Sequence, residues 1–397
     1  MRRLGRCALV LALVFGGCGG EDPEDANRIR GDTLTIYSSG PRHGASAATG
    51  AAVFAGQRRA LQEVGGRAGG RRIRLVRLSA TRPGDSLWDP GVVEANADRA
   101  RKDPTAIAYL GELDSGGSAV SLPVTNRAQL LQISPLDGLT SLTEAPPGRP
   151  RAGPERYYPE RTRTFARLVP NDLVVAEGIR TLLPRRGAKA IAILHGEGIA
   201  DREFTAVLVN RLRRRGAEPA FVETLRDDVD TVPKTVRRLT ASRPAAVVLV
   251  ARYGPATALT LTALARARPA MPVIGTAAFV DGASQVGPAD LRAITPVLPS
   301  QAQSAPGRRV LADLEGRDGI PTRPEALYGY AAMRLVLAAI DRAGPDRRGV
   351  VRDARTPGRR RTVLGTLALE RDGDVRTRRL AVLRVRRGKA SLERVLP

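Results

Sequence analysis

A chain of 397 residues with 42% hydrophobic residues is long enough for two or three packed domains, which excludes a disordered chain. Its formal charge of +24 comes almost entirely from arginine, which is scattered along the whole chain and forms no long basic tail. Aromatic residues make up only 4% and do not alternate with the arginines, so a nucleic-acid stacking surface is missing. We therefore expect no nucleic acid partner and a basic surface that faces an anionic lipid layer or an acidic wall polymer.

The N-terminus has the parts of an export signal. Three arginines among the first six residues precede an apolar run over 7–15, which is too short to span a bilayer. Gly16-Gly17-Cys18 then resembles a bacterial lipobox, which predicts a signal peptide over 1–17, a lipid on Cys18 and a flexible tether over 18–31. No disulfide is expected, because Cys18 would be the one cysteine left. The alternative is an ordinary secretory signal with an incidental cysteine.

The first third of the chain alternates strand and helix patterns. Apolar, β-branched runs predict strands at 33–37 and 72–78, and helical spacing predicts helices at 46–64 and 90–102. Paired glycines after residue 64 suit the end of the first helix. This order favours a parallel sheet that is covered by helices on both faces.

Residues 105–138 are expected to form one compact βαβ unit around which the chain is organised. Strands at 105–110 and 130–134 flank a short helix that starts at Ser115. Ser115-Gly116-Gly117 offers free backbone N–H groups, a hydroxyl and no bulky side chain, which suits a carboxylate or another anion. The loop 135–138 leaves the same sheet edge and would form the facing wall. The alternative is that Ser115 only caps the helix.

A second set of alternating elements begins near Thr164. Asp172 and Asp201 are expected to cap helices that run to 183 and 215. The tail contains an expected helix at 325–342 and two alternating segments around the turn 371–374. Strands of the second set are expected at 164–169, 188–195, 219–225, 245–250 and 273–275. Two α/β lobes follow from the two sets.

These features resemble the solute-binding proteins of ABC importers, above all the branched-chain amino-acid (Leu/Ile/Val) binding family with the type I periplasmic-binding fold. The resemblance implies an α/β fold of two doubly wound parallel-sheet lobes, joined by a three-stranded hinge, that close on a small ligand. Crossings are expected near Thr164, Thr295 and Gly349, so lobe 1 comprises 32–163 and 296–349, and lobe 2 comprises 164–295 and 350–397. Matching motifs extend along nearly all of the chain after the tether: Gly40-Pro41, ALQEVGG at 60–66, IAYLG at 107–111 with Ser115, ISP at 133–135, TFAR at 164–167, YGYAA at 328–332 and the segment 365–373.

The resemblance also implies ligand-binding residues. Ser115 and Gly116 match the loop that holds a ligand carboxylate, and Leu113 matches the apolar contact before it. A second-lobe aromatic matches Tyr253, whereas the other aromatic, expected near Ala200, is absent. The facing wall corresponds to Leu136, Asp137 and Gly138, without the family's threonine.

The acidic partner of a ligand ammonium is expected after Gly275, where Thr276-Ala277-Ala278 stands instead. Asp137 and Asp281 are the candidate substitutes, because burying an unpaired ammonium is costly. If neither substitutes, the ligand is not a standard amino acid.

Enzyme motifs are missing from the sequence. It has no P-loop, no G-x-S-x-G elbow and no zinc-like Cys/His spacing, so we expect no catalytic residues, no metal and no cofactor. His195 ends an apolar strand, where it either faces the ligand or makes structural hydrogen bonds. We expect an extracytoplasmic monomer, anchored to the membrane by lipid only, whose partners are a small molecule and ABC permease subunits. The alternative is a ligand-sensing lipoprotein of the same fold that signals through a separate partner.

Overall fold

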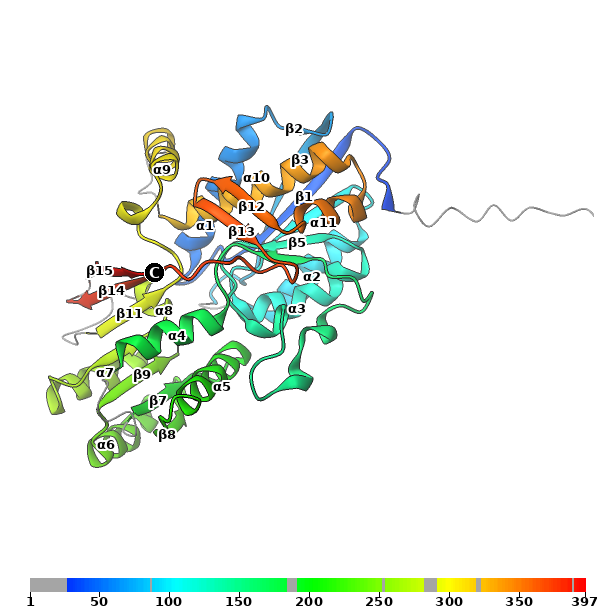
Figure 1. The fold of residues 1–397 in the computed structure, drawn as a ribbon. Helices are drawn as coiled ribbons and strands as arrows, with labels where there is room; N and C mark the ends of the chain where they lie inside the picture. Colours follow the sequence, from blue (N-terminus) through cyan, green and yellow to red (C-terminus); the bar gives the residue numbers. More distant parts are fainter. Residues whose placement is uncertain are drawn as a thin grey trace, which may run out of the picture.

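Two open sheets, each flanked by helices, form the two lobes of the molecule (Figure 1). The computed structural model describes residues 27–85, 88–183, 191–251, 254–281, 291–318, 323–387 and 389–397. Both sheets are mainly parallel, which confirms the predicted fold class.

Lobe 1 is built on a six-stranded sheet with the order β2-β3-β1-β4-β5-β6, in which only β2 is antiparallel. Its strands are β1 Thr33–Gly40, β2 Arg67–Ala68, β3 Arg71–Ser79, β4 Ala106–Leu110, β5 Leu131–Ser134 and β6 Phe165–Arg167. Its helices are α1 Ala47–Glu63, α2 Pro90–Lys102, α3 Ser115–Arg127, α9 Ala305–Asp318, α10 Glu325–Ala343 and α11 Arg347–Ala354.

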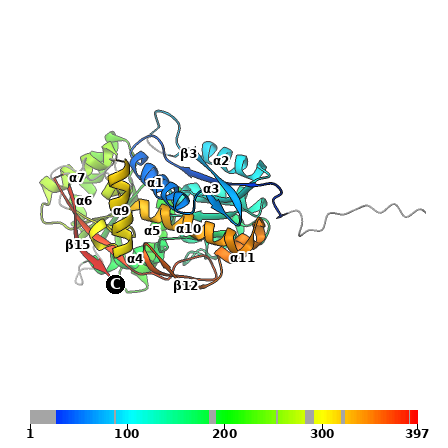
Figure 2. The same cartoon turned by 90° about the horizontal axis from the view of Figure 1, so that it is seen from above.

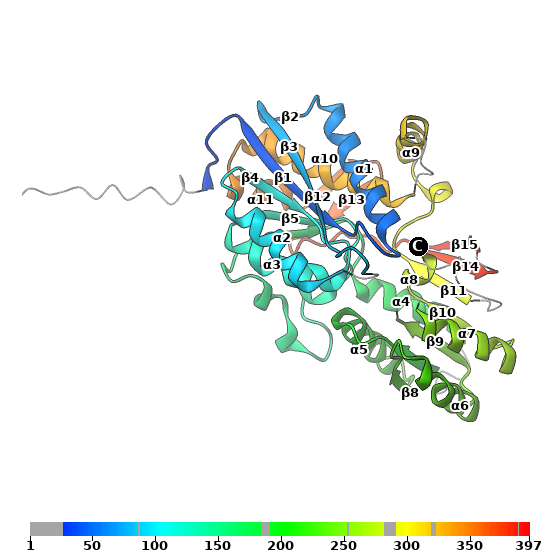
Figure 3. The ribbon, with the colours of Figure 1, turned by 180° about the vertical axis from the view of Figure 1, so that it is seen from behind.

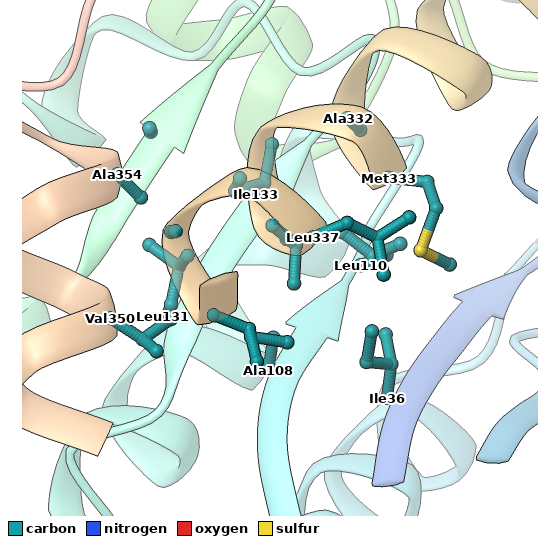
Figure 4. Packing of buried hydrophobic residues seen from close by; sticks show 14 of the residues in the cluster. Ile36, Ala108, Leu110, Leu131, Ile133, Ala332, Met333, Leu337, Val350 and Ala354 are labelled. Atoms are coloured by element: carbon teal, nitrogen blue, oxygen red, sulfur yellow. The ribbon is translucent and has the colours of Figure 1, made fainter. Parts of the chain in front are cut away.

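Side chains that alternate along these strands bury both faces of the lobe 1 sheet. Ile36 and Ala108 belong to the core under α1, α10 and α11, whereas Tyr37 and Tyr109 belong to the core under α2 and α3. Figure 4 shows Met333 and Leu337 of α10 directed at the sheet, with Val350 of α11 next to Leu131. Burial of both faces explains why the strands are near-continuous apolar runs.

Lobe 2 is built on a seven-stranded sheet with the order β15-β14-β11-β10-β9-β7-β8. The strands are β7 Ile191–His195, β8 Pro219–Thr224, β9 Ala246–Val250, β10 Val273–Gly275, β11 Leu291–Thr295, β14 Leu380–Arg386 and β15 Lys389–Leu396. The helices are α4 Asp172–Leu182, α5 Ile199–Arg213, α6 Val232–Ser242, α7 Pro255–Ala267 and α8 Ala278–Asp281. β14 and β15 are antiparallel, and the described pairs among the other strands are parallel.

The sheets show where the chain passes between the lobes. β6 pairs with β5, so the first crossing follows residue 167, close to Thr164. Val350 of α11 and Leu369 share the lobe 1 core, so the last crossing precedes β14 instead of lying near Gly349. α11 packs in the same core cluster as α10, so this segment belongs to lobe 1.

A two-stranded sheet of β12 Gly358–Thr362 and β13 Gly365–Leu369 covers part of lobe 1. β13 pairs with β12, whereas the next strand, β14, pairs with β11 and β15 in lobe 2. The predicted turn at 371–374 thus does not join two neighbouring strands of one hairpin.

The end of the predicted tether is also wrong, because Arg28 bridges to Asp346 and the Ile29 amide donates to the Pro345 carbonyl at 2.7 Å.

Candidate functional site

The carboxyl ends of β4 and β5 lead into two loops that lie beside the first turn of α3. Ser115 is the first helical residue and Asp114 is the N-cap, without a side-chain capping hydrogen bond. Ser115 therefore does not cap α3, contrary to the alternative considered from the sequence. The Gly117 amide donates to the Asp114 carbonyl at 2.9 Å, which leaves the Ser115 and Gly116 amides as the free donors of this turn in the described part of the chain.

Both glycines of the loop are required by packing inside lobe 1. A Cβ on Gly116 would lie 2.5 Å from Cζ2 of Trp88, and one on Gly117 would lie 2.9 Å from Cγ of Glu112. The absence of side chains at 116 and 117 therefore brings an indole and a carboxyl group against α3. The sequence interpretation, which assigned the small residues to an approaching ligand, missed these two neighbours.

Trp88 is the one tryptophan of the chain and is half-buried against Gly116. It immediately precedes Asp89, whose carboxylate caps α2 by accepting from the Val92 amide at 2.8 Å. One sequence signal could have identified Trp88 as a site residue. It is an aromatic residue next to a helix cap, in a chain with only 4% aromatics.

Glu112 is a buried acid directly under the first turn of α3. Its carboxyl oxygens accept hydrogen bonds from Ser39 at 2.7 Å and from Tyr109 at 2.5 Å. Burial is the main cause that raises the pKa of Glu112 to about 7, while these two hydrogen bonds oppose the rise. The positive end of α3 thus already faces an ionisable group of the protein itself.

The facing loop supplies three of the predicted site residues, each with a different environment. Leu136 is half-buried and packs against the lobe 1 core. Asp137 is fully buried, and its Oδ1 accepts from the Leu139 amide at 2.8 Å. A Cβ on Gly138 would lie 2.6 Å from Oδ1 of Asp172. Leu113 lies across the sheet edge, with its Cδ1 3.3 Å from the Cβ position of Gly40.

Lobe 2 meets this edge through the start of α5 (Figure 3). The Ser141 amide of lobe 1 donates to Oε1 of Glu203 at 2.8 Å, and Ala200 packs against the cluster that contains Leu122 of α3. Because Ala200 is small, α5 can approach α3. This packing explains why the aromatic residue expected near position 200 is absent. Asn171, not Asp172, caps α4, and α5 begins at Ile199 with Gly198 as its N-cap, so both predicted capping aspartates lie inside the helices.

Arg167 is a fully buried cation at the crossing between the lobes. Its Nε lies 2.8 Å from Oδ1 of Asp374, and its Nη1 donates to the carbonyls of Asp137 at 3.1 Å and Leu139 at 2.9 Å. The guanidinium therefore holds the facing loop against the last crossing segment.

Some of the predicted residues are not placed at the site. Tyr253, Cys18 and the side chain of Asp281 lie outside the described residues. His195 is engaged by the Gly196 carbonyl, 2.8 Å from its Nδ1, and has Thr224 Oγ1 at 3.5 Å from Nε2, which supports the structural interpretation of this residue.

Comparison with known proteins decides the family. A sequence model of the family described as "Periplasmic binding protein" matches residues 33–390. This chain belongs to the periplasmic binding protein family. Membership implies an extracytoplasmic solute-binding protein, since the family is one of binding proteins and not of enzymes. No curated protein sequence matches the chain.

Solved structures share the fold of this periplasmic binding protein at low sequence identity. A leucine-binding protein from Thermotoga maritima is 19% identical, with a TM-score of 0.74 over 91% of this chain and 98% of that one. A substrate-binding protein from Desulfitobacterium hafniense, solved with leucine, is 15% identical, with a TM-score of 0.72 over 91% and 99%. One from Rhodopseudomonas palustris, solved with benzoate, is 17% identical, with a TM-score of 0.70 over 91% and 96%. These likenesses confirm the type I periplasmic-binding fold.

Other kinds of functional site have little support among the described residues. Their helices include none with the length and apolarity to cross a bilayer, and their His, Cys, Asp and Glu side chains form no metal-binding group of three. A cavity of about 30 Å³ lies behind β12 and β13, lined mainly by apolar side chains such as Leu168 and Leu369. This cavity is too small for a solute.

Proposed function

We propose that this chain is the solute-binding lipoprotein of an ABC importer, which traps a small polar ligand between its lobes and delivers it to a membrane permease. Family membership and the two lobes support this proposal. The solved relatives, named as leucine-binding or substrate-binding proteins of ABC transporters, support the same role. We expect the chain to act as a monomer and without catalysis.

The observation that carries the proposal is the first turn of α3. The Ser115 and Gly116 amides have no partner in the described part of the chain, at a sheet edge where Ser141 of lobe 1 contacts Glu203 of lobe 2. Helix N-termini of this kind bind polar or anionic groups. Ser115 and Gly116 would therefore hold one polar group of the ligand.

The remaining proposed contacts surround this turn. Leu113 and the segment Leu136–Gly138 would line the lobe 1 side, and Tyr253 the lobe 2 side. Such an arrangement buries most of a small ligand once the lobes meet.

Mass spectrometry of the purified protein tests the proposal, in native and then in denaturing solution. We expect a small molecule that leaves the protein only on unfolding. Calorimetry with that compound, after unfolding, dialysis and refolding, should give one site per chain. A protein that carries and binds no small molecule would contradict the proposal.

A further inference from the structure

We propose that one end of lobe 1 is a membrane-docking surface that lies against anionic phospholipids. This surface, the basic edge, is defined by the exposed side chains of Arg28, Arg72, Arg348 and Arg352. It lies at the amino ends of the parallel lobe 1 strands, opposite the edge where α3 begins. The inference goes beyond solute binding and rests on the proposed function only through the lipid on Cys18.

The chain enters lobe 1 at the basic edge. The Ile29 amide donates to the Pro345 carbonyl at 2.7 Å, and Arg28 forms a bridge to Asp346 directly before α11. Ile29 is only 5% exposed and belongs to the lobe 1 core, so this entry point is fixed. Figures 1 and 3 show the entry point at the end of lobe 1 that lies away from lobe 2.

The predicted lipid is close to this entry point along the chain. Cys18 precedes Arg28 by ten residues, and ten residues of any chain reach at most about 36 Å. A lipid on Cys18 would therefore keep the basic edge near the headgroups. Such a short tether gives a high effective concentration of the surface at the membrane, so that a weak attraction is enough to orient the protein.

Strand pairing and α11 bring the arginines of the basic edge together. Arg72 lies at the start of β3, where it pairs with Thr33 of β1. Arg348 and Arg352 are four residues apart and share the exposed face of α11. The preceding Arg347 instead turns inward and donates to backbone carbonyls at and before the start of β4. These contacts hold α11 at the same end of the sheet as the start of β3.

Acidic side chains near the basic edge are engaged by other neighbours. Asp346 caps α11 by accepting from two backbone amides. Both oxygens of Asp353 accept from Arg342, at 2.8 and 2.7 Å. Asp32 lies 3.9 Å from Arg71. The four arginines that define the basic edge have no ion pair in the described part of the chain, so this surface presents a surplus of positive charge.

Anionic phospholipids fit this surface by chemistry and by position. The planar guanidinium group binds phosphate in bidentate geometry, and a leaflet offers many phosphates in one plane. The attraction of each arginine to an anionic leaflet adds to that of the others. An acidic wall polymer shares this chemistry, but the short tether places the headgroup plane, and not the polymer, at the basic edge. Docking at this end leaves the opposite edge of lobe 1 open to solutes.

Vesicle sedimentation of the full chain with Cys18→Ser, which has no predicted lipid, tests the inference. Vesicles of phosphatidylglycerol and phosphatidylcholine should bind it roughly tenfold or more tightly than phosphatidylcholine alone, which reports apolar binding, and added salt should reduce the difference. Arg348→Gln with Arg352→Gln should weaken binding to the anionic vesicles roughly ten- to thirtyfold. Lys234→Gln with Arg237→Gln on α6 of lobe 2 removes the same charge from another exposed helix face. This matched control should weaken binding less than about threefold.

The outcomes separate this inference from the proposed function. Equal binding to anionic and neutral vesicles overturns the inference, and so does an equal loss in the two double variants when both melt like the parent. Tighter binding to soluble poly(glycerol phosphate) than to vesicles at the same phosphate concentration overturns it in favour of a wall polymer. A parent that binds anionic vesicles as expected but carries and binds no small molecule contradicts the proposed function alone.

Discussion

Glu112 should make lobe 1 sensitive to pH, because burial raises the pKa of its carboxyl group to about 7. The folded protein keeps a proton that the unfolded chain releases above its ordinary pKa of 4.5. The stability that this proton contributes is therefore full below about pH 4.5 and is lost as the pH rises toward 7. The shift corresponds to ~3 kcal/mol at most.

Glu112→Gln removes this titration and keeps a side chain of the same shape. Urea unfolding at about pH 5 and about pH 8 should show a larger loss of unfolding free energy for the parent than for the variant. Equal losses in the two proteins would mean that Glu112 is not the group responsible.

Ser115 separates binding from stability, because it does not cap α3. We expect the Ser115 hydroxyl to donate to the same ligand group as the two free amides, so Ser115→Ala, which removes only the hydroxyl, should weaken binding of the copurified ligand roughly ten- to a hundredfold. The melting temperature should hardly change, since substitutions away from caps and cores stay within about 0.5 kcal/mol. Calorimetry and thermal unfolding of the same sample check both. Unchanged affinity would place the ligand elsewhere.

At the scale of elements, α1 and α10 cross in direct backbone contact (Figure 2). A Cβ on Gly56 would overlap the Ala326 carbonyl oxygen, and one on Gly329 would overlap that of Val53. Gly56→Ala should therefore separate the helices and destabilise the protein by about 1–3 kcal/mol. Gly316→Ala on the exposed face of α9, where a Cβ meets no atom within 4 Å, should instead be neutral or stabilising by about 0.5–1 kcal/mol. Urea unfolding of both variants compares them, and equal midpoints would contradict the contact.

Periodicity predicted most helices and strands of the two lobes but not how the tail is shared between them. The alternating segment expected after the turn 371–374 was predicted correctly in type, as strand β14, yet its partners β11 and β15 had no prediction. Helix α9 was missed, since its sequence contains Pro306, Gly307 and Gly316 and few apolar residues. Pairing between distant segments depends on tertiary packing, which local patterns do not report.

The strand-to-helix turn at Ser115 was predictable from the sequence and is confirmed between β4 and α3, whereas its surroundings were not predictable. Its role as the ligand site stays a prediction. Trp88 and Asp172 come from other loops, and their contacts with Gly116 and Gly138 emerge only when the chain is folded. The glycines that suggested an open anion cradle are in contact with Trp88 and Glu112.

At the scale of the whole molecule, the lipid anchor is a separate prediction from the sequence. Cys18→Ser should release the protein from the membrane fraction into the soluble fraction, because the mature chain would lose its lipid. Fractionation after a high-salt wash, which removes proteins held by arginine charge alone, checks this. A variant that stays with the membrane would place the anchor elsewhere.

The central claim is that the two lobes close on a small ligand, and small-angle scattering tests it most directly. The ligand-free protein and the protein saturated with its copurified compound should differ in radius of gyration, with the smaller value for the saturated protein. An equal radius of gyration at saturation, with binding verified by calorimetry on the same sample, would contradict the claim.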